Sequence, residues 1–427
     1  MAAHDAPRVR LVTGDMVYGP QAVARQDGKV VFVRGAAPDE EVDALIREQR
    51  RSFAFADTVE VVRPSPQRRP PPCPYLPACG GCPWQHLTYE AQLAAKQRIV
   101  AEQLRRIGGI DTAVAPVLPS PREFGCRGRI KLRVDRGTVG FYAAGSHVLV
   151  PVEHCLLAEP EVDAGIGCAE VLVRGLSMRL RRVELLGRPA AGDGLVVVGE
   201  IEGRWDARDE PVCRDWLARH PAVRGLALHG RGWRRRWGDV RVCFEPERGL
   251  SLTAHAPGFT QVNPAANQLL VATVVASVDP QPSQQILDLY AGAGNLSLPL
   301  RRRGTAIIAV EQERGAAADA VANGERYPGP PLRVIAARAE QALERLEAEH
   351  VRADAVVLDP PRSGAAGCIP ALLRLAPPRI VYVACDPTTL ARDLAGLRTR
   401  YQIDAVQPID MFPHTYHVEI VVRASLV

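Results

Sequence analysis

The sequence predicts an α/β protein with a C-terminal Rossmann-like domain, a small N-terminal β-barrel and a β-rich region between them. From about residue 256 onwards, short apolar runs alternate with helical stretches, which is the pattern of a doubly wound sheet. Residues 1–64 instead alternate apolar and polar residues over short runs separated by turn signals, as small barrels do. Residues 126–255 are interpreted as strands joined by uneven turns.

Length and composition limit the possible classes of protein. A chain of 427 residues has room for about three domains. It contains no apolar run long enough to span a membrane and no signal peptide at its start, so we expect a cytoplasmic protein without a membrane partner. The net charge of +5 is weak support for nucleic acid binding, because arginine is abundant throughout. In a reducing compartment, we expect the ten cysteines to bind metal, catalyse or pack rather than form disulfides.

The first 72 residues divide into the barrel and a linker. Turn signals at residues 17–20 and 26–29 separate the apolar runs, and residues 29–33 and 58–62 are predicted strands. The stretch 63–72 is rich in proline and arginine and can form neither a helix nor a central strand, so we expect it to be a linker.

A cysteine-rich stretch follows the linker. Cys73, Cys79 and Cys82 have the spacing Cys-x5-Cys-x2-Cys, and the Gly80-Gly81 pair between them lets the backbone wrap tightly. This density of cysteines indicates a metal cluster, with a structural zinc site as the alternative. A fourth ligand must come from elsewhere, and spacing alone does not choose among Cys126, Cys155, Cys168, Cys213 and Cys243.

The central region contains two basic segments. A predicted helix over residues 88–109 precedes them and ends at a Gly-Gly pair. A basic loop at residues 231–241 has two tryptophans among its arginines, a combination that suits phosphate contacts and base stacking. Residues 127–133 alternate cationic and other residues, so we predict that one face of a strand presents four cations to RNA, with a solvated hairpin as the alternative: Arg127, Arg129, Lys131 and Arg133.

The C-terminal region is predicted to contain a parallel sheet whose loops gather at one edge. A strand over residues 285–290 leads into the glycine-containing loop 291–295 and a helix over residues 296–303, which is a turn where a ligand can approach the backbone closely. Glu311 ends the following strand, where it could accept the ribose hydroxyls of an adenosine; a solvated loop carboxylate is the alternative. The later strands are predicted at residues 305–310, 353–358, 380–384 and 418–423, and the second of these ends at Asp359-Pro360-Pro361.

Cys385 follows the apolar run 381–384 and precedes a proline-containing turn. An α/β fold places nucleophiles at such strand ends, although a lone cysteine is more often buried and structural. Beside a cofactor-type loop, this thiol suggests methyl transfer from S-adenosylmethionine to an unreactive carbon, such as carbon 5 of a pyrimidine. Thiolate addition to carbon 6 would activate carbon 5, and a base would then remove the carbon 5 proton. Glu419, His414 and His417 are the candidates for that base.

Five segments, in this order, resemble the RNA uracil-5-methyltransferase family, the S-adenosylmethionine-dependent enzymes that make 5-methyluridine in ribosomal and transfer RNA. They are residues 258–264 (GFTQVNP), 288–295 (DLYAGAGN), 359–364 (DPPRSG), 385–387 (CDP) and 414–419 (HTYHVE). The N-terminal barrel resembles the family's TRAM domain, an OB-like β-barrel that binds RNA. The cysteine-rich stretch resembles the 4Fe-4S branch of the family, which is close to the bacterial 23S ribosomal RNA enzymes.

The resemblance implies a class I methyltransferase fold for the C-terminal domain and a role for individual residues. Cys385 would be the nucleophile, and Glu419 the base that acts at carbon 5. The cofactor contacts would come from Gln261, Tyr290, Glu311 and Asp359, with Asn295 nearby. A 4Fe-4S cluster would be held by Cys73, Cys79, Cys82 and Cys155.

The resemblance also implies a division into domains and a partner. The TRAM-like barrel would span residues 1–64, the central iron-sulfur domain residues 73–87 and 126–255, and the methyltransferase domain residues 88–125 and 256–427. The expected cofactors are S-adenosylmethionine and the 4Fe-4S cluster. The expected partner is structured RNA, with ribosomal RNA preferred over transfer RNA, and the enzyme is expected to act as a monomer without a protein partner.

Two residues depart from the family's pattern. Asp386 stands where asparagine is usual, and a carboxylate there should raise the pKa of Cys385 unless its side chain turns away or is hydrogen-bonded. Ala291 replaces a frequent cysteine, which should matter little. The competing interpretations are a cytosine-5-methyltransferase, which usually has a second active-site cysteine, and a non-catalytic RNA-binding or RNA-folding protein of the same fold.

Overall fold

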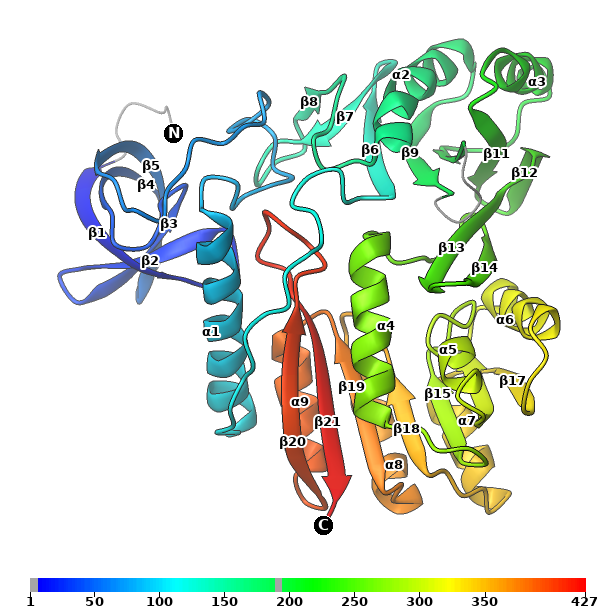
Figure 1. Ribbon diagram of the computed structural model, residues 1–427. Coiled ribbons are helices and arrows are strands. Elements are labelled where there is room, and N and C mark those ends of the chain that lie inside the picture. Colours follow the sequence, from blue (N-terminus) through cyan, green and yellow to red (C-terminus); the bar gives the residue numbers. More distant parts are fainter. Residues whose placement is uncertain (1–6, 189–193) are drawn as a thin grey trace.

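A closed five-stranded barrel is the N-terminal unit of the computed structural model, which describes residues 7–188 and 194–427 (Figure 1). Its strands follow the order β1-β2-β3-β5-β4, and β1 pairs with β4 to close the barrel. Alternate side chains point inwards, so Val31 and Val33 are buried and the residues between and beside them are less so. The predicted barrel is confirmed, with strands β1 (Arg8–Met16), β2 (Gln21–Gln26), β3 (Lys29–Arg34), β4 (Glu41–Gln49) and β5 (Phe53–Arg63).

The long helix α1 (Tyr89–Gly108) joins the barrel to the catalytic domain. The Thr88 side chain caps its first turn by accepting a hydrogen bond from the Ala91 amide, and Gly109 ends it in the left-handed conformation. The predicted helix is therefore present. Its early residues Ala91, Ala95 and Ile99 pack into the barrel core, whereas Val100 and Leu104 pack into the core of the C-terminal domain.

A seven-stranded sheet forms the central unit, in the order β12-β11-β10-β9-β6-β7-β8. The helices α2 (Pro160–Gly175) and α3 (Asp209–Arg219) cover one face, so the region is less exclusively β than its sequence suggested. Apolar side chains at helical spacing in α2 bury against the sheet, including Val162, Ile166 and Ala169. The strands are β6 (Arg129–Asp135), β7 (Thr138–Tyr142), β8 (Leu149–Pro151), β9 (Leu180–Gly187), β10 (Leu195–Ile201), β11 (Val223–Gly230) and β12 (Trp233–Gly238).

A hairpin of β13 (Arg241–Glu247) and β14 (Leu250–His255) lies between the central sheet and the C-terminal domain (Figure 1). Val242 near its start packs on the sheet face that the helices leave open. Phe244 and Leu252 instead pack against the C-terminal domain, where they contact a cluster that includes Ala293. The hairpin therefore fixes the central sheet on the catalytic domain through two separate apolar contacts.

The C-terminal sheet has the order β17-β16-β15-β18-β19-β21-β20. Its first five strands are parallel, and β21 runs antiparallel to both β19 and β20. The chain order reverses between β15 and β18, so the loops after these strands flank the crevice where α/β sheets bind ligands. The strands are β15 (Gln285–Leu289), β16 (Ala306–Glu311), β17 (Leu332–Ala336), β18 (Ala355–Leu358), β19 (Arg379–Ala384), β20 (Tyr401–Ile409) and β21 (Glu419–Leu426).

Helices cover both faces of this sheet, which confirms the predicted doubly wound fold (Figure 1). One apolar cluster includes α4 and α5, and the cluster on the other face includes α1, α7, α8 and α9. Proline in the first turn begins α4, α8 and α9, where its missing N–H costs nothing. The helices are α4 (Pro264–Val278), α5 (Ser297–Arg301), α6 (Arg314–Arg326), α7 (Ala339–Ala348), α8 (Ile369–Leu375) and α9 (Pro387–Leu397).

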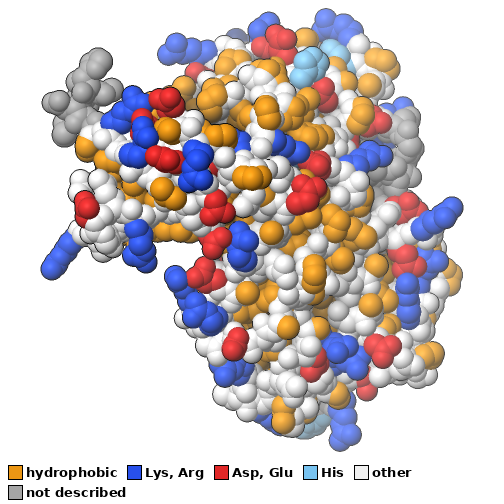
Figure 2. Space-filling model, turned by 60° about the vertical axis from the view of Figure 1, so that its left-hand side comes forward, with side chains coloured by type: hydrophobic (Ala, Val, Ile, Leu, Met, Phe, Trp, Pro, Cys, Tyr) orange, Lys and Arg blue, Asp and Glu red, His pale blue; other side chains and the backbone are white. Residues whose placement is uncertain are grey.

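The surface carries charges of both signs. Figure 2 shows Lys and Arg side chains interspersed with Asp and Glu side chains over the face that it presents. Binding of a polyanion on such a surface has to depend on local groups of unpaired cations rather than on net charge. In the part of the chain that the structure describes, no helix has the length and apolar character needed to cross a membrane.

A buried ion pair ties α1 to the chain that leads into the last strand. Lys96 Nζ lies 2.5 Å from Asp410 Oδ1 and donates to Phe412 O at 3.0 Å, and both charged side chains are fully buried. Tyr89 Oη donates to the other oxygen of Asp410 at 2.8 Å. Burial lowers the pKa of Lys96, and Asp410 opposes that shift. The pair thus fixes the start of the loop that carries His414 and leads to β21.

Asp410→Asn should lower the free energy of unfolding by about 3–5 kcal/mol, because it leaves the buried Lys96 charge without a counter-ion. The double change Lys96→Met with Asp410→Asn should cost less, since no buried charge then remains. Glu102→Gln, which breaks the exposed pair with Arg106 on the same helix, should cost less than about 1 kcal/mol. Urea unfolding followed by fluorescence measures all three. Equal losses for Asp410→Asn and Glu102→Gln would contradict this account.

Candidate active site

The register of β19 and β21 brings a thiol and a carboxyl group together. Ala384 lies opposite Ile420 in this antiparallel pair, so the adjoining residues Cys385 and Glu419 meet at the edge where the parallel strands end. The Cys385 side chain is half-buried, and Glu419 is only 2% exposed. The two strongest catalytic candidates from the sequence therefore lie in one site.

Burial and negative neighbours raise the pKa values of the acidic groups in this site. Burial, with added contributions from Glu419 and Asp359, raises the pKa of Cys385 to about 12, and Arg362 opposes this shift. Burial raises the pKa of Asp359 to about 7. Burial and then the Asp359 charge raise the pKa of Glu419 well above its usual range. A cation bound among these groups would favour their ionised forms and oppose each shift, so the site suits a positively charged ligand.

Asp386 uses its side chain to cap a helix. One carboxylate oxygen, Oδ1, accepts hydrogen bonds from the amides of Thr388 at 2.9 Å and Thr389 at 3.1 Å, at the N-terminus of α9. Its other oxygen accepts a hydrogen bond from Tyr18 Oη at 3.2 Å. Asp386 raises the pKa of Cys385, as expected, but four other contributions to that pKa are larger. The aspartate is therefore a hydrogen-bonded cap rather than a free charge beside the thiol.

The loop after β15 leaves space for a ligand against its backbone. Gly292 has a φ of 57°, and nothing lies within 4 Å of the position that a Cβ would take. Its amide donates to Glu311 Oε2 at 2.9 Å, and the Glu313 amide donates to Oε1 at 2.7 Å. Glu311 is thus held at the loop by two backbone amides. Each of its oxygens keeps a free lone pair for a ligand hydroxyl, as the sequence suggested.

The other predicted cofactor residues differ in the groups that their side chains contact. Gln261 Nε2 lies 3.5 Å from Asp359 Oδ2, so these two side chains face each other across the carboxyl edge of the sheet. Tyr290 has a positive φ of 64°, and its hydroxyl lies 3.4 Å from Cys368 Sγ. The Asn295 amide is paired at both ends with the amide of Asn267, at 2.8 and 2.9 Å. This pairing fixes the Asn295 side chain and leaves one N–H and one lone pair of its amide free for a ligand.

The two histidines considered as bases differ in their surroundings. His414 is fully buried, with its ring stacked on Phe124 at 4.4 Å and its Nε2 3.0 Å from Glu123 O. Burial, aided by Arg69, lowers the pKa of His414 to about 3. Burial and then Arg362 lower the pKa of His417 to about 4. Both rings are neutral at pH 7, and His414 is a packed structural residue.

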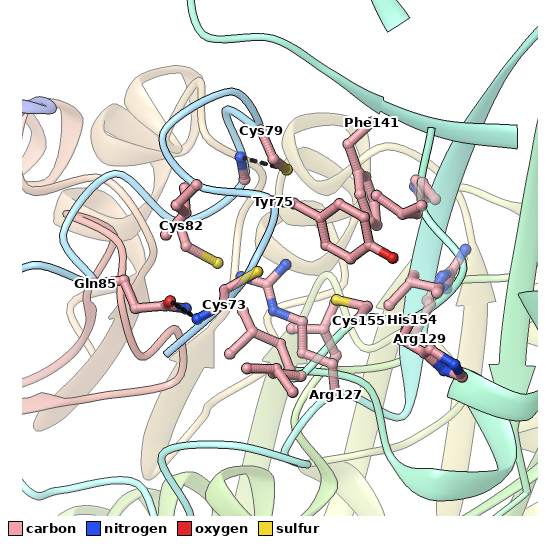
Figure 3. A pocket seen from close by; sticks show the side chains of 18 of the residues that line it. Cys73, Tyr75, Cys79, Cys82, Gln85, Arg127, Arg129, Phe141, His154 and Cys155 are labelled. Carbon is pink, nitrogen blue, oxygen red and sulfur yellow. Dashed lines mark hydrogen bonds between the residues drawn. The ribbon is translucent and has the colours of Figure 1, made fainter. Parts of the chain in front are cut away.

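Four cysteines line one cavity of about 360 Å³. Figure 3 shows the sulfur atoms of Cys73, Cys79, Cys82 and Cys155 around one space, with the Arg127 side chain beside them. The loop that carries three of them is fixed against the end of β7, because Gly80 N donates to Tyr142 O at 3.0 Å. A Cβ on Gly80 would come within 2.9 Å of the Ala144 backbone, so only glycine fits there. The remaining candidates for a fourth ligand do not line this cavity: Cys126, Cys168, Cys213 and Cys243.

All ten cysteines are free thiols in this structure. Within residues 7–188 and 194–427, no group of three or more Cys, His, Asp or Glu side chains is arranged to hold a single metal ion. Burial raises the pKa of Cys82 to about 12, and it also raises the pKa of Cys79 and Cys155. The Nε atom of Arg127 is buried without a hydrogen-bond partner among the described residues. The cavity thus contains four thiols and one unsatisfied cationic group.

Comparison with known proteins identifies the family. The model of the tRNA (Uracil-5-)-methyltransferase family matches residues 247–425, and that of the TRAM domain matches residues 11–59. A curated relative from Dechloromonas aromatica, named 23S rRNA (uracil(1939)-C(5))-methyltransferase RlmD, is 35% identical over 420 residues, which cover 93% of this chain and 95% of the relative.

The chain belongs to the RNA uracil-5-methyltransferase family.

Two further proteins show the range of the similarity. An RlmD of the same name from Pectobacterium atrosepticum is 34% identical and covers 93% of this chain and 89% of the relative. The crystal structure of a tRNA (uracil-54, C5)-methyltransferase from Pyrococcus abyssi aligns with a TM-score of 0.73 at 23% identity, over 97% of this chain and 100% of the other. That structure supports the class I methyltransferase fold predicted from the sequence.

The sequence predicted that four alternating cations, in β6 and just before it, face RNA. This prediction is wrong for Arg129. This side chain is buried, lies 2.5 Å from Glu184 Oε1 and donates to Gly258 O at 3.0 Å, so it joins β6 to β9 and to the methyltransferase domain. Arg127 points into the cysteine cavity. Of the four cations, Lys131 is exposed but pairs with Glu184 at 3.3 Å, and Arg133 is partly exposed.

Two residues near Cys385 were not identified from the sequence. Arg362 follows the Asp-Pro-Pro segment and lowers the pKa of Cys385 and of His417. Its position directly after two prolines at a strand end was the signal that could have found it. Tyr18 reaches the same site from the barrel, and no sequence pattern links it to a residue 368 positions away.

Proposed function

We propose that this chain transfers a methyl group from S-adenosylmethionine to carbon 5 of a uridine in structured RNA. The observation that carries the proposal is the meeting of Cys385 and Glu419 across β19 and β21, beside the ligand-accessible loop after β15. Family membership gives the reaction class, and the curated relatives are named for 23S ribosomal RNA. We therefore favour ribosomal RNA as substrate.

In the proposed mechanism, each residue acts in one step. The Cys385 thiolate adds to carbon 6 of the uracil, and the electron pair of the 5,6 double bond moves towards the carbonyl at carbon 4 as an enolate. Bound S-adenosylmethionine supplies the methyl group that this activated carbon 5 takes up. The Glu419 carboxylate then removes the remaining proton from carbon 5, so that the bond between Sγ and carbon 6 breaks and the double bond returns. Arg362 favours the thiolate at the first step because its charge lowers the pKa of Cys385.

The residues around the crevice fit a cationic methyl donor. Asp359 and Glu419 form an acidic site that would favour the positive sulfonium, and the open space over Gly292 lets a ligand approach the backbone. Glu311, at the end of β16, is available for the ribose hydroxyls. In this proposal Gln261, Tyr290, Glu311 and Asp359 contact the cofactor, and Asn295 supports the loop.

Transfer RNA is the second candidate substrate. The matching family model is described as a tRNA enzyme, and the Pyrococcus abyssi neighbour is named for tRNA. A non-catalytic role of the same fold is disfavoured, because both the thiol and the carboxyl group needed for the reaction are present in one site.

We further propose that Cys73, Cys79, Cys82 and Cys155 hold a 4Fe-4S cluster. A cluster is larger than a single ion, so its ligands stand apart around a cavity, as these four sulfur atoms do. An anionic cluster would also satisfy the buried Nε of Arg127. Bound there, the cluster would join the cysteine-rich loop to the stretch between β8 and α2, and its role would be structural.

The proposed domain division follows the boundaries given by the resemblance. The barrel spans residues 1–64, the central domain residues 73–87 and 126–255, and the methyltransferase domain residues 88–125 and 256–427. The second part of the central domain ends with the β13–β14 hairpin, which packs on both neighbouring units. The assignment of α1 to the methyltransferase domain is supported by the packing of its second half against that core.

We propose that the open face of the central sheet contacts RNA phosphates. Strand pairing aligns one row of polar side chains across five strands, and none of them is buried: Arg133, Arg182, Glu200, His229 and Arg234. Four strand spacings make this row roughly 19 Å long. Arg182 is paired with Glu200 at 2.8 Å, whereas Arg133 stacks on the Tyr142 ring at 5.0 Å. Arginines at the two ends of the row are thus available to a backbone that crosses the sheet.

Glu419→Gln should stop turnover after the methyl transfer, because the carbon 5 proton can no longer be removed. A covalent complex of protein and methylated RNA should then accumulate and survive denaturing electrophoresis. Cys385→Ala is the matched control, and it should give neither product nor adduct, since the nucleophile is missing. An adduct in the Cys385→Ala protein, or full turnover by Glu419→Gln, would contradict the assigned roles.

Cys79→Ala should abolish cluster assembly, because it removes one of the four proposed ligands. Wild-type protein prepared without oxygen should contain about four iron atoms per chain and show visible absorption from bound iron and sulfide. Cys243→Ala, outside the cavity, should retain the iron of the wild type. Iron analysis distinguishes these results, and equal iron in both variants would argue against the site.

Arg133→Ala and Arg234→Ala should each weaken RNA binding and reduce the slope of log affinity against log salt by about 1, as expected for the loss of one phosphate contact. Filter binding at several salt concentrations gives this slope. Arg106→Ala, an exposed arginine in the last turn of α1, is the control and should leave the slope unchanged. Unchanged slopes for both sheet variants would remove the sheet face from the RNA-binding surface.

A further inference from the structure

The barrel contacts the turn that carries the nucleophile. Tyr18 lies in the loop between β1 and β2, and its hydroxyl donates to Asp386 Oδ2 at 3.2 Å. The same loop is anchored next to it, because Trp84 Nε1 donates to Gly19 O at 3.0 Å and the Trp84 side chain is fully buried. The Tyr18 ring also packs edge-on against Tyr416, with centroids 5.6 Å apart, in the loop that leads to Glu419.

Asp386 transmits this contact to the nucleophile through the backbone. Its Oδ1 is held by the amides of Thr388 and Thr389, so its own backbone is fixed at the start of α9. Cys385 is the preceding residue and lies just beyond Ala384, the last residue of β19 that is paired with β21. The direction of Cys385 Sγ therefore depends on how the Asp386 side chain is held from both of its oxygens.

We propose that Tyr18 is a positioning residue, whose hydrogen bond to Asp386 sets the orientation of the Cys385 thiol and links it to the barrel that binds RNA. The proposal rests on the proposed function, because it concerns the nucleophile of that reaction. It assigns the barrel a second role beyond RNA affinity, since movement of the barrel on the catalytic domain would change the turn that presents the thiol.

The chemistry of the contact explains why aspartate suits this position. A carboxylate has only acceptor oxygens, so it can accept from two amides at one oxygen and from a phenol at the other. Burial and then the Asp386 charge raise the pKa of Tyr18, which keeps its hydroxyl protonated and able to donate. An asparagine would keep the cap through its carbonyl oxygen and could donate its amide to the Tyr18 oxygen, so the link would survive with its polarity reversed.

The test measures chemistry and RNA affinity separately. RNA with 5-fluorouridine at the target traps the covalent adduct, because no proton can be removed from carbon 5. The single-turnover rate of adduct formation then reports the orientation of the thiol, and filter binding reports affinity. Tyr18→Phe should slow adduct formation about tenfold, the effect of losing one hydrogen bond to a charged group, with the dissociation constant for RNA almost unchanged.

Two controls keep the result specific. Tyr401→Phe removes a hydroxyl that donates to Pro377 O at 2.9 Å. Tyr401 is paired with Leu426, at the end of β21 far from Glu419, so the change should leave the rate unchanged. Asp386→Ala should slow adduct formation. Adding Tyr18→Phe to this variant should cause no further loss of rate, because the hydrogen bond between the two side chains is already absent. Asp386→Asn should recover most of the rate.

The outcomes separate this proposal from the proposed function. A wild-type protein that forms no adduct would overturn both. Adduct formation by the wild type with an unchanged rate for Tyr18→Phe would overturn the positioning role alone. Additive losses for Tyr18→Phe and Asp386→Ala, or an Asp386→Asn variant as slow as Asp386→Ala, would also contradict it. If Tyr18→Phe fails to fold, the asparagine and alanine variants of Asp386 still test the same bond.

Discussion

The antiparallel pairing of β21 with β19 is the constraint on which the site depends. A parallel strand in the position of β21 would bring its carboxyl end and the loop after it to the site. It would not bring its first residue there. Because β21 runs antiparallel to β19, its first residue, Glu419, lies at the end of β19, next to Cys385. The buried Lys96–Asp410 pair and the packing of His414 fix the loop that delivers this first residue.

The electrostatics of the site follow from the same geometry. Cys385, Asp359 and Glu419 lie together at one edge of the sheet, and burial raises the pKa of all three. The charge of Asp359 raises the pKa of Glu419 further, and the charges of Glu419 and Asp359 raise that of Cys385. Arg362 is the cation that opposes this trend at the thiol. Under the proposed function, a positively charged methyl donor bound here would favour the ionised forms of these groups, including the thiolate of Cys385.

The sequence was informative where chemistry is local. Apolar runs followed by Asp359, Glu311 and Cys385 indicated strand ends, and parallel strands must bring such ends together. The helices α2 and α3 were not foreseen, although α2 has apolar residues at helical spacing. Contacts between distant segments were out of reach: Arg129 pairs with Glu184 on another strand instead of facing RNA, and Tyr18 meets Asp386 from a different domain. Such contacts depend on how the domains pack, which no local pattern encodes.

The most direct test of the central claim is nucleoside mass spectrometry of 5-methyluridine in separated ribosomal and transfer RNA. Cells lacking the gene should lose 5-methyluridine from ribosomal RNA, and the wild-type gene should restore it, whereas a Cys385→Ala copy should not. Loss from transfer RNA alone would keep the reaction and change the substrate. Unchanged 5-methyluridine in both fractions, or restoration by the Cys385→Ala copy, would contradict the account of Cys385 as the nucleophile of an RNA uracil methyltransferase.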